Sequence, residues 1–97
     1  MTTPAFSVRV TPHFERLAKA LNRRHADFIV SYEKAIGILS IDPYNRTRNY
    51  QIKKLKNVAA GEGAWRLRLG RWRFRYDIWD QQVELSYCGL RREDTYR

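Results

Sequence analysis

Two hydrophobic periods divide the chain. Before residue 43 apolar side chains recur mostly every three or four positions, and from residue 65 onward they alternate with polar ones. The first spacing is typical of an amphipathic helix, and the second is typical of a half-buried strand. The pattern therefore predicts helices in the N-terminal part and strands in the C-terminal part, which indicates an α+β domain.

The N-terminal part predicts a strand and a helical hairpin. Residues 6–10 alternate apolar and polar side chains, which is the pattern of a short strand. Thr11-Pro12 offers a helix start, because threonine caps N–H groups and proline suits the first helical position. Asp42-Pro43 ends the second helix, because the residue before proline avoids helical geometry. The two apolar stripes are Phe14, Leu17, Ala18 and Leu21, then Phe28, Ile29, Tyr32, Ala35, Ile36 and Leu39.

The C-terminal part predicts a three-stranded antiparallel meander. Residues 43–63 read as a polar connection, and three alternating segments follow it. Short turns at Gly70-Arg71 and Asp80-Gln81 make neighbouring strands antiparallel, and Gly89 is expected to end the last strand. We expect one small sheet with the helices on one face. The alternation assigns to the helix side Trp65, Leu67, Leu69, Trp72, Phe74, Tyr76, Ile78, Val83, Leu85 and Tyr87, and to the other side Glu84, Ser86 and Cys88.

Arginines occupy the polar positions of the first two strands of this meander. Arg66 and Arg68 precede the first turn, and Arg73 and Arg75 follow it, so the four should cluster laterally on one face. Like charges on adjacent strands repel and cost stability. A sheet face that tolerates them is better matched to an anionic ligand than to the needs of the fold.

Composition narrows the function class. The chain has 97 residues and 43% hydrophobic content, which suits a single domain over residues 1–97. No long apolar run predicts a transmembrane helix, the N-terminus does not resemble a secretory signal, and Cys88 has no partner for an internal disulfide. We therefore expect a cytoplasmic protein with no membrane association.

The positive charge is concentrated rather than spread. The net charge is +9, and residues 53–75 hold eight basic residues and one acid, which leaves +7 in that segment. Such a segment favours polyanions, of which nucleic acid is the commonest. No His, Cys, Asp or Glu cluster has metal-ligand spacing, so neither a metal nor a cofactor is expected. His13 and His25 are interpreted as structural or surface residues.

Three motifs together resemble the RelE/ParE toxin superfamily of type II toxin–antitoxin systems, and the resemblance covers nearly the whole chain. They are Leu55-Lys56 before a glycine-containing loop, the W-R-x-R and W-R-x-x-Y strands at Trp65–Arg68 and Trp72–Tyr76, and the terminal R-R-x-x-x-Y at Arg91–Tyr96. The resemblance implies a RelE-like fold, which is also that of microbial ribonucleases. In the RelE-like branch it implies an endoribonuclease that cleaves messenger RNA, often in the ribosomal A site, by attack of the 2′-hydroxyl on the neighbouring phosphate.

The resemblance also implies residue roles. Arg73 matches an arginine that holds the scissile phosphate, and Tyr96 matches a tyrosine that stacks on a base or transfers a proton. Arg91 matches an arginine that stabilises the transition state, and Arg92 takes this role if the alignment is shifted by one residue. Arg66 and Arg68 stand where the family often has lysines, and an arginine cannot accept a proton. The residues expected to bind RNA phosphates are Lys53, Lys54, Lys56, Arg66, Arg68, Arg75 and Arg92.

Two other functions remain open. A ParE-like protein shares the fold and inhibits DNA gyrase without nuclease chemistry, and a plain RNA- or ribosome-binding module would bind without cleaving. The joint presence of Arg73, Arg91 and Tyr96 favours the nuclease. The expected partners are a small antitoxin rich in acidic residues, the ribosome and messenger RNA.

Overall fold

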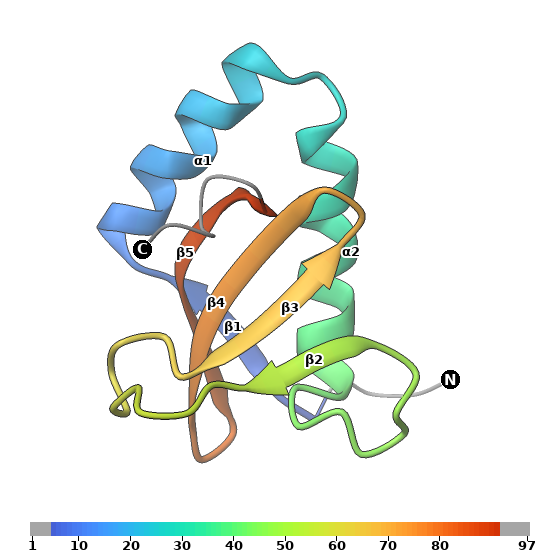
Figure 1. Cartoon of the computed structure of the whole chain (residues 1–97), viewed down its shortest axis with the longest axis vertical. Coiled ribbons are helices and arrows are strands. Elements are labelled where there is room, and N and C mark those ends of the chain that lie inside the picture. Colours follow the sequence, from blue (N-terminus) through green and yellow to red (C-terminus); the bar gives the residue numbers. More distant parts are fainter. Residues whose placement is uncertain (1–4, 92–97) are drawn as a thin grey trace.

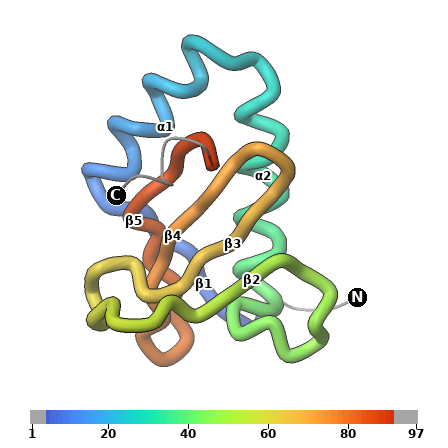
Figure 2. Tube along the Cα trace, viewed as in Figure 1, coloured from blue at the N-terminus to red at the C-terminus, as the bar shows by residue number. Residues whose placement is uncertain are grey.

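The computed structural model describes residues 5–91. These residues form two helices and one five-stranded sheet (Figure 1). The sheet order is β1-β5-β4-β3-β2; β1 pairs with β5 in parallel and the other neighbours are antiparallel. The two helices join β1 to β2 along the chain, and β3, β4 and β5 follow as a meander (Figure 2). The elements are β1 (Ser7–Val10), α1 (Pro12–Arg24), α2 (Phe28–Ile41), β2 (Gln51–Lys54), β3 (Trp65–Leu69), β4 (Trp72–Trp79) and β5 (Gln82–Leu90).

Local chemistry sets the ends of the helices. Thr11 Oγ1 accepts a hydrogen bond of 3.1 Å from the Phe14 N–H, and Pro12 stands at the start of α1, as the sequence predicts. After α2, the Asp42 carboxylate accepts hydrogen bonds from the Arg46 N–H at 2.8 Å and from the Thr47 N–H and hydroxyl at 3.2 and 2.6 Å. Asp42 thus turns the chain out of α2 and toward β2.

The core lies between the helices and one face of the sheet. Phe14 and Phe28 of the helices pack with Leu67 and Phe74 of the sheet, and each of these side chains is at most 1% exposed. The Tyr76 hydroxyl donates a hydrogen bond of 2.7 Å to the Pro43 carbonyl, which ties β4 to the end of α2. The predicted α+β fold, with both helices on one face, is confirmed.

The predicted connection over residues 43–63 is wrong in one respect, because it contains strand β2. β2 pairs with β3 from Gln51↔Arg68 to Lys54↔Trp65, and it lies at the edge of the sheet. Its four residues carry only one apolar side chain, Ile52. An edge strand that is largely exposed needs no hydrophobic alternation, so the period does not reveal it.

A β-bulge changes the faces of β5. Arg75 pairs with Tyr87 but the next residue, Tyr76, pairs with Leu85, so Ser86 is an extra residue in β5. Beyond a bulge the side-chain alternation is shifted by one position. The predicted orientations of Tyr87 and Cys88 are therefore wrong: Cys88 is buried in the core at 2% exposure, and Tyr87 lies on the arginine side.

β5 also continues beyond its predicted end. Gly89 was expected to terminate the strand, but it pairs with Arg73, and Leu90 pairs with Trp72. The ladder then extends by one more hydrogen bond, from the Arg91 N–H to the Arg71 carbonyl at 2.9 Å. Glycine weakens a strand without ending it when the partner strand continues alongside.

Candidate functional site

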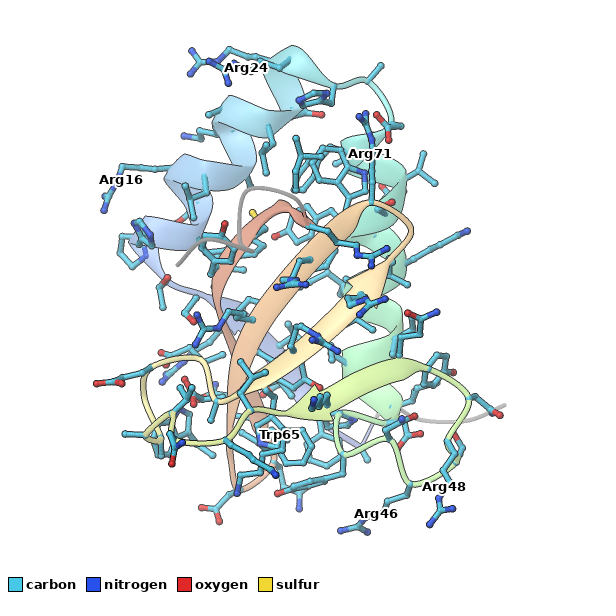
Figure 3. The ribbon with its side chains drawn as sticks, in the orientation of Figure 1. Arg16, Arg24, Arg46, Arg48, Trp65 and Arg71 are labelled. Atoms are coloured by element: carbon cyan, nitrogen blue, oxygen red, sulfur yellow. The ribbon has the colours of Figure 1, made fainter. Side chains whose placement is uncertain are left out.

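Four arginines, Arg66, Arg68, Arg73 and Arg75, lie together on the face of the sheet opposite the helices, and we call them the arginine cluster. Arg66 pairs directly with Arg75, and Arg68 pairs directly with Arg73. Opposed residues of antiparallel strands have their Cβ atoms about 4.5–5.5 Å apart. Figure 3 shows nitrogen-tipped side chains over β3 and β4 on the face turned toward the viewer. The lateral clustering predicted from the sequence is confirmed.

Three of these guanidinium groups are partly buried. The Nε atoms of Arg66, Arg68 and Arg73 are all withdrawn from solvent. Arg68 Nε has no hydrogen-bond partner among residues 5–91. A buried donor of this kind costs about 1–3 kcal/mol when it lacks an acceptor. A phosphate oxygen placed over the cluster would supply one, in the geometry that suits a guanidinium fork.

The β2–β3 loop, residues 55–64, covers one end of the same face and is fastened there by Asp77. The Asp77 carboxylate is 2% exposed and accepts hydrogen bonds from the N–H groups of Gly61, Gly63 and Ala64 at 3.0, 2.9 and 3.1 Å. Gly63 has φ +75°, and a Cβ there would lie 3.1 Å from both Arg75 Cβ and Ser86 Oγ. The loop can approach the sheet this closely because residue 63 has no side chain.

Arg75 is shared between the cluster and this loop. Its Nε donates to the Gly63 carbonyl at 3.0 Å, and its Nη2 donates to the Glu62 carbonyl at 3.1 Å. The expectation that Arg75 binds RNA phosphate stays a prediction, and the structure shows that two of its guanidinium nitrogens donate to backbone carbonyls. Asp77 was not assigned a role from the sequence. The sequence does contain a signal for Asp77. This acidic residue continues the alternate positions of Arg73 and Arg75, and two glycines, Gly61 and Gly63, precede it in the chain.

The three predicted lysines are not brought together. Lys53 pairs with Arg66 and lies beside the arginine cluster at the edge of the sheet. Lys54 pairs with Trp65, and its Nζ lies 5.9 Å from the centre of that ring, toward the other face. Lys56 is exposed in the β2–β3 loop.

The predicted C-terminal residues fall partly outside the described chain. Arg92 and Tyr96 lie beyond residues 5–91, so their expected roles stay predictions. Arg91 is exposed and its backbone is held next to Arg71 by the hydrogen bond that continues the β4–β5 ladder. This places Arg91 at the end of the strand pair that carries Arg73.

Tyr87 is a residue of this face that sequence reasoning missed. The bulge at Ser86 turns Tyr87 to the arginine side, opposite Arg75. An ideal Cβ on Gly89 would lie 2.5 Å from the Tyr87 hydroxyl oxygen, so the phenol ring lies over Gly89. Gly89 is in turn opposite Arg73. The alternation in the sequence runs through β5 without a break, so nothing in it marks Ser86 as a bulge residue.

Arg71, which belongs to the same basic segment, has a structural contact instead. Its guanidinium bonds the Asp27 carboxylate at 2.6 and 3.2 Å and lies 4.8 Å from the Trp72 ring centre. Trp72 Nε1 donates to the same carboxylate at 3.1 Å, and His25 Nδ1 lies 3.3 Å from Arg71 Nη2. The Arg71 hydrogen bond lowers the pKa of Asp27. These contacts fasten the β3–β4 turn to the segment between the helices.

Two buried titratable side chains, Tyr76 and Cys88, are poor candidates for proton transfer. Burial raises the pKa of the Tyr76 phenol, and it raises the pKa of the Cys88 thiol to about 12.

Within residues 5–91 no three His, Cys, Asp or Glu side chains are grouped so that they could hold a metal ion. Neither described helix has the length and the apolar character that a membrane crossing requires.

Comparison with known proteins relates this fold to toxins. No protein-family model and no curated protein sequence matches the chain. The chain is 26% identical to a protein in the toxin–antitoxin complex RelBE2 of Mycobacterium tuberculosis, over 92% of this chain and 100% of that one, with a TM-score of 0.69. It is 13% identical to one in the DinJ–YafQ toxin–antitoxin complex of E. coli, over 92% and 96%, with a TM-score of 0.71.

A third toxin–antitoxin complex matches with a lower TM-score. The chain is 15% identical to a protein in the RelB–RelE antitoxin–toxin complex of Methanococcus jannaschii, over 88% of this chain and 92% of that one, with a TM-score of 0.52. In these three comparisons the likeness extends over 88–92% of this chain and 92–100% of the other chain. The chain therefore has the fold of proteins found in these toxin–antitoxin complexes, and this likeness supports a RelE-like toxin.

Proposed function

We propose that this chain is the toxin of a type II toxin–antitoxin system and an endoribonuclease that cleaves messenger RNA in the ribosomal A site. The observation that carries the proposal is the pairing of Arg68 with Arg73 on the open face of the sheet, beside Arg66. Fixed cations on a solvent-facing sheet destabilise the fold itself. They suit a reaction in which negative charge grows on a phosphate.

The proposed reaction needs no cofactor. The 2′-oxygen of the RNA forms a bond to phosphorus, the bond from phosphorus to the 5′-oxygen breaks, and a 2′,3′-cyclic phosphate and a 5′-hydroxyl result. Arg73 and Arg68 hold the nonbridging oxygens as the phosphorane forms, and Arg91 stabilises the same charge from the end of the strand pair. The charge stabilisation that a metal ion supplies elsewhere comes here from guanidinium groups.

The described residues of this face offer few groups that could transfer a proton. Arginine cannot act as a base, and the described face offers no histidine. We assign proton transfer to Tyr96, and we assign alignment of the 2′-hydroxyl to the ribosome. Such a reaction takes place in the cytoplasm.

An antitoxin is the natural partner of this surface. The RelBE2 and DinJ–YafQ structures are complexes of a toxin with its antitoxin. For this chain we propose a protein rich in Asp and Glu that folds onto the arginine cluster and supplies carboxylate acceptors for its guanidinium groups. Such a partner would block the site by occupying it.

Primer extension on a defined message in a bacterial translation extract tests the proposed function. The wild-type protein should create new RNA ends only in translating samples, and Arg73→Ala should lower their rate of formation by about 10²–10³-fold. Arg16→Ala is the matched control, because Arg16 is an exposed arginine of α1 that points away from the sheet (Figure 3). Intact message with the wild-type protein would refute the nuclease and favour inhibition of gyrase, which a supercoiling assay detects.

A further inference from the structure

Two features of β5 place the Tyr87 phenol on the sheet face that carries the arginine cluster. The bulge at Ser86 turns the side chain of Tyr87 to this face, where it stands opposite Arg75. Two residues further on, Gly89 is buried although it has no side chain of its own. The Tyr87 ring covers it: an ideal Cβ on Gly89 would lie 2.5 Å from the hydroxyl oxygen and 3.0 Å from Cζ.

The position of the hydroxyl follows from the strand register. Because Gly89 is the partner of Arg73, the space of a Gly89 Cβ is also the space next to Arg73 Cβ, about 4.5–5.5 Å away in an antiparallel pair. The phenol therefore ends beside Arg73 rather than at the rim of the sheet. The φ angle of Gly89 is not in the left-handed region, so the backbone does not need glycine there. What the glycine provides is room for the phenol.

We propose that the Tyr87 hydroxyl is a substrate-binding group that donates a hydrogen bond to a nonbridging oxygen of the RNA phosphate held by Arg73 and Arg68. This inference rests on the proposed function for the identity of the ligand. A phosphate offers several acceptor lone pairs, and a neutral phenol adds a donor without adding a fifth positive charge to the cluster.

A purely structural role for Tyr87 makes a different prediction. If Tyr87 only supported the fold, removing its hydroxyl would change the stability of the protein and leave its affinity for RNA as it was. A phosphate contact would be lost with the oxygen atom alone. Tyr87→Phe therefore separates the two roles, and Gly89→Ala tests the seat of the ring, since the new methyl group would displace the phenol.

The experiment compares Tyr87→Phe, Gly89→Ala and the double variant with the wild-type protein. One readout is the rate of message cleavage in the translation extract. The other is the affinity for a short 2′-deoxy oligonucleotide that cannot be cleaved, measured by fluorescence anisotropy. Tyr32→Phe is the matched control, because Tyr32 is a half-buried tyrosine of α2 packed on Phe14 and Phe28, on the helix side of the sheet.

We expect Tyr87→Phe to lower the cleavage rate about 10–100-fold and the affinity roughly tenfold. Gly89→Ala should give a similar loss, and the double variant should lose no more than either single one, because both changes remove one contact. Tyr32→Phe should match the wild type in both readouts. Wild-type cleavage and affinity in Tyr87→Phe, or additive losses in the double variant, would overturn the proposal.

The two readouts distinguish failure of this inference from failure of the proposed function. A wild-type protein that binds the oligonucleotide in a Tyr87-dependent way but leaves the message intact would refute the nuclease and support the phosphate contact. A wild-type protein that cleaves the message at a rate unaffected by Tyr87→Phe would support the nuclease and refute the contact. Absence of both cleavage and binding would refute both.

Discussion

Arg68 and Arg73 stand directly opposite each other on β3 and β4, on the sheet face that the helices leave uncovered. Two guanidinium groups in this relationship repel each other, and Arg68 Nε lacks a hydrogen-bond acceptor among the described residues. The pair therefore lowers the stability of the isolated protein. An anion that lies between or above the two side chains would reduce this repulsion.

Arg68→Gln should therefore stabilise the protein while weakening RNA binding. We expect the free energy of unfolding to rise by about 0.5–1 kcal/mol at low ionic strength, because one member of a like-charge pair is removed. The gain should shrink in high salt, which screens the repulsion. Urea denaturation at two salt concentrations measures the gain in the free energy of unfolding and its dependence on salt. Arg16→Gln on α1 is the control, and an Arg68→Gln protein no more stable than wild type would contradict the assigned repulsion.

Asp77→Asn should loosen the β2–β3 loop. The carboxylate accepts three backbone N–H groups, and an amide NH₂ in place of one oxygen would face a donor. We expect a loss of about 1–3 kcal/mol in the free energy of unfolding, and faster hydrogen exchange at Gly61 and Gly63. Asp80→Asn is the matched control, because Asp80 is an exposed turn residue with φ 53°, which asparagine tolerates. Equal stability of the two variants would rule out the loop anchor.

Asp42 should make stability depend on pH in the acidic range. Burial alone would raise its pKa, but hydrogen bonds from the Thr47 hydroxyl and from the backbone N–H groups of Arg46 and Thr47 outweigh it, and the pKa lies below the ordinary value of 3.8. The ionised carboxylate therefore stabilises the fold above that value. This stabilisation is lost as the pH falls through the lowered pKa.

Thr47→Ala tests this dependence. It removes the 2.6 Å hydrogen bond to Asp42 and should cost about 1.5–3 kcal/mol at pH 7, where the carboxylate is charged. The difference from wild type should become smaller as Asp42 is protonated at low pH. Denaturant unfolding across pH 2.5–7 gives the curve. Ser40→Ala, which removes an exposed hydroxyl bonded to the Gly37 carbonyl, should differ from wild type by the same amount at every pH.

Cys88 should be chemically inert in the folded protein. Its thiol is 2% exposed, and burial raises its pKa to about 12, so almost no thiolate forms near neutral pH. We expect Ellman's reagent to label the native protein at about the rate of global unfolding and to label it at once in concentrated urea. Fast labelling of the native protein would mean that Cys88 faces solvent, as an uninterrupted alternation in β5 predicts.

The sequence predicted the elements wherever one hydrophobic period governs a segment. The stripes beginning at Phe14 and Phe28 gave both helices, and the alternation from Trp65 to Ile78 gave β3, β4 and the shared face of the arginine cluster. These features depend on spacing along the chain, because side-chain direction repeats with the backbone period. Tight turns then brought the arginines of consecutive strands together without any information from distant residues.

Only the tertiary structure decided how distant segments share the arginine face. The edge strand β2 carries too little hydrophobic pattern to be seen, and it exists because β3 offers unpaired backbone groups. The bulge at Ser86 reverses the faces of Tyr87 and Cys88, since one extra residue shifts a period of two. Asp77 finds its partners 13 to 16 residues away in the β2–β3 loop. A local pattern records which way each side chain points, whereas pairing, bulges and buried hydrogen bonds depend on backbone groups that come together only when the chain folds.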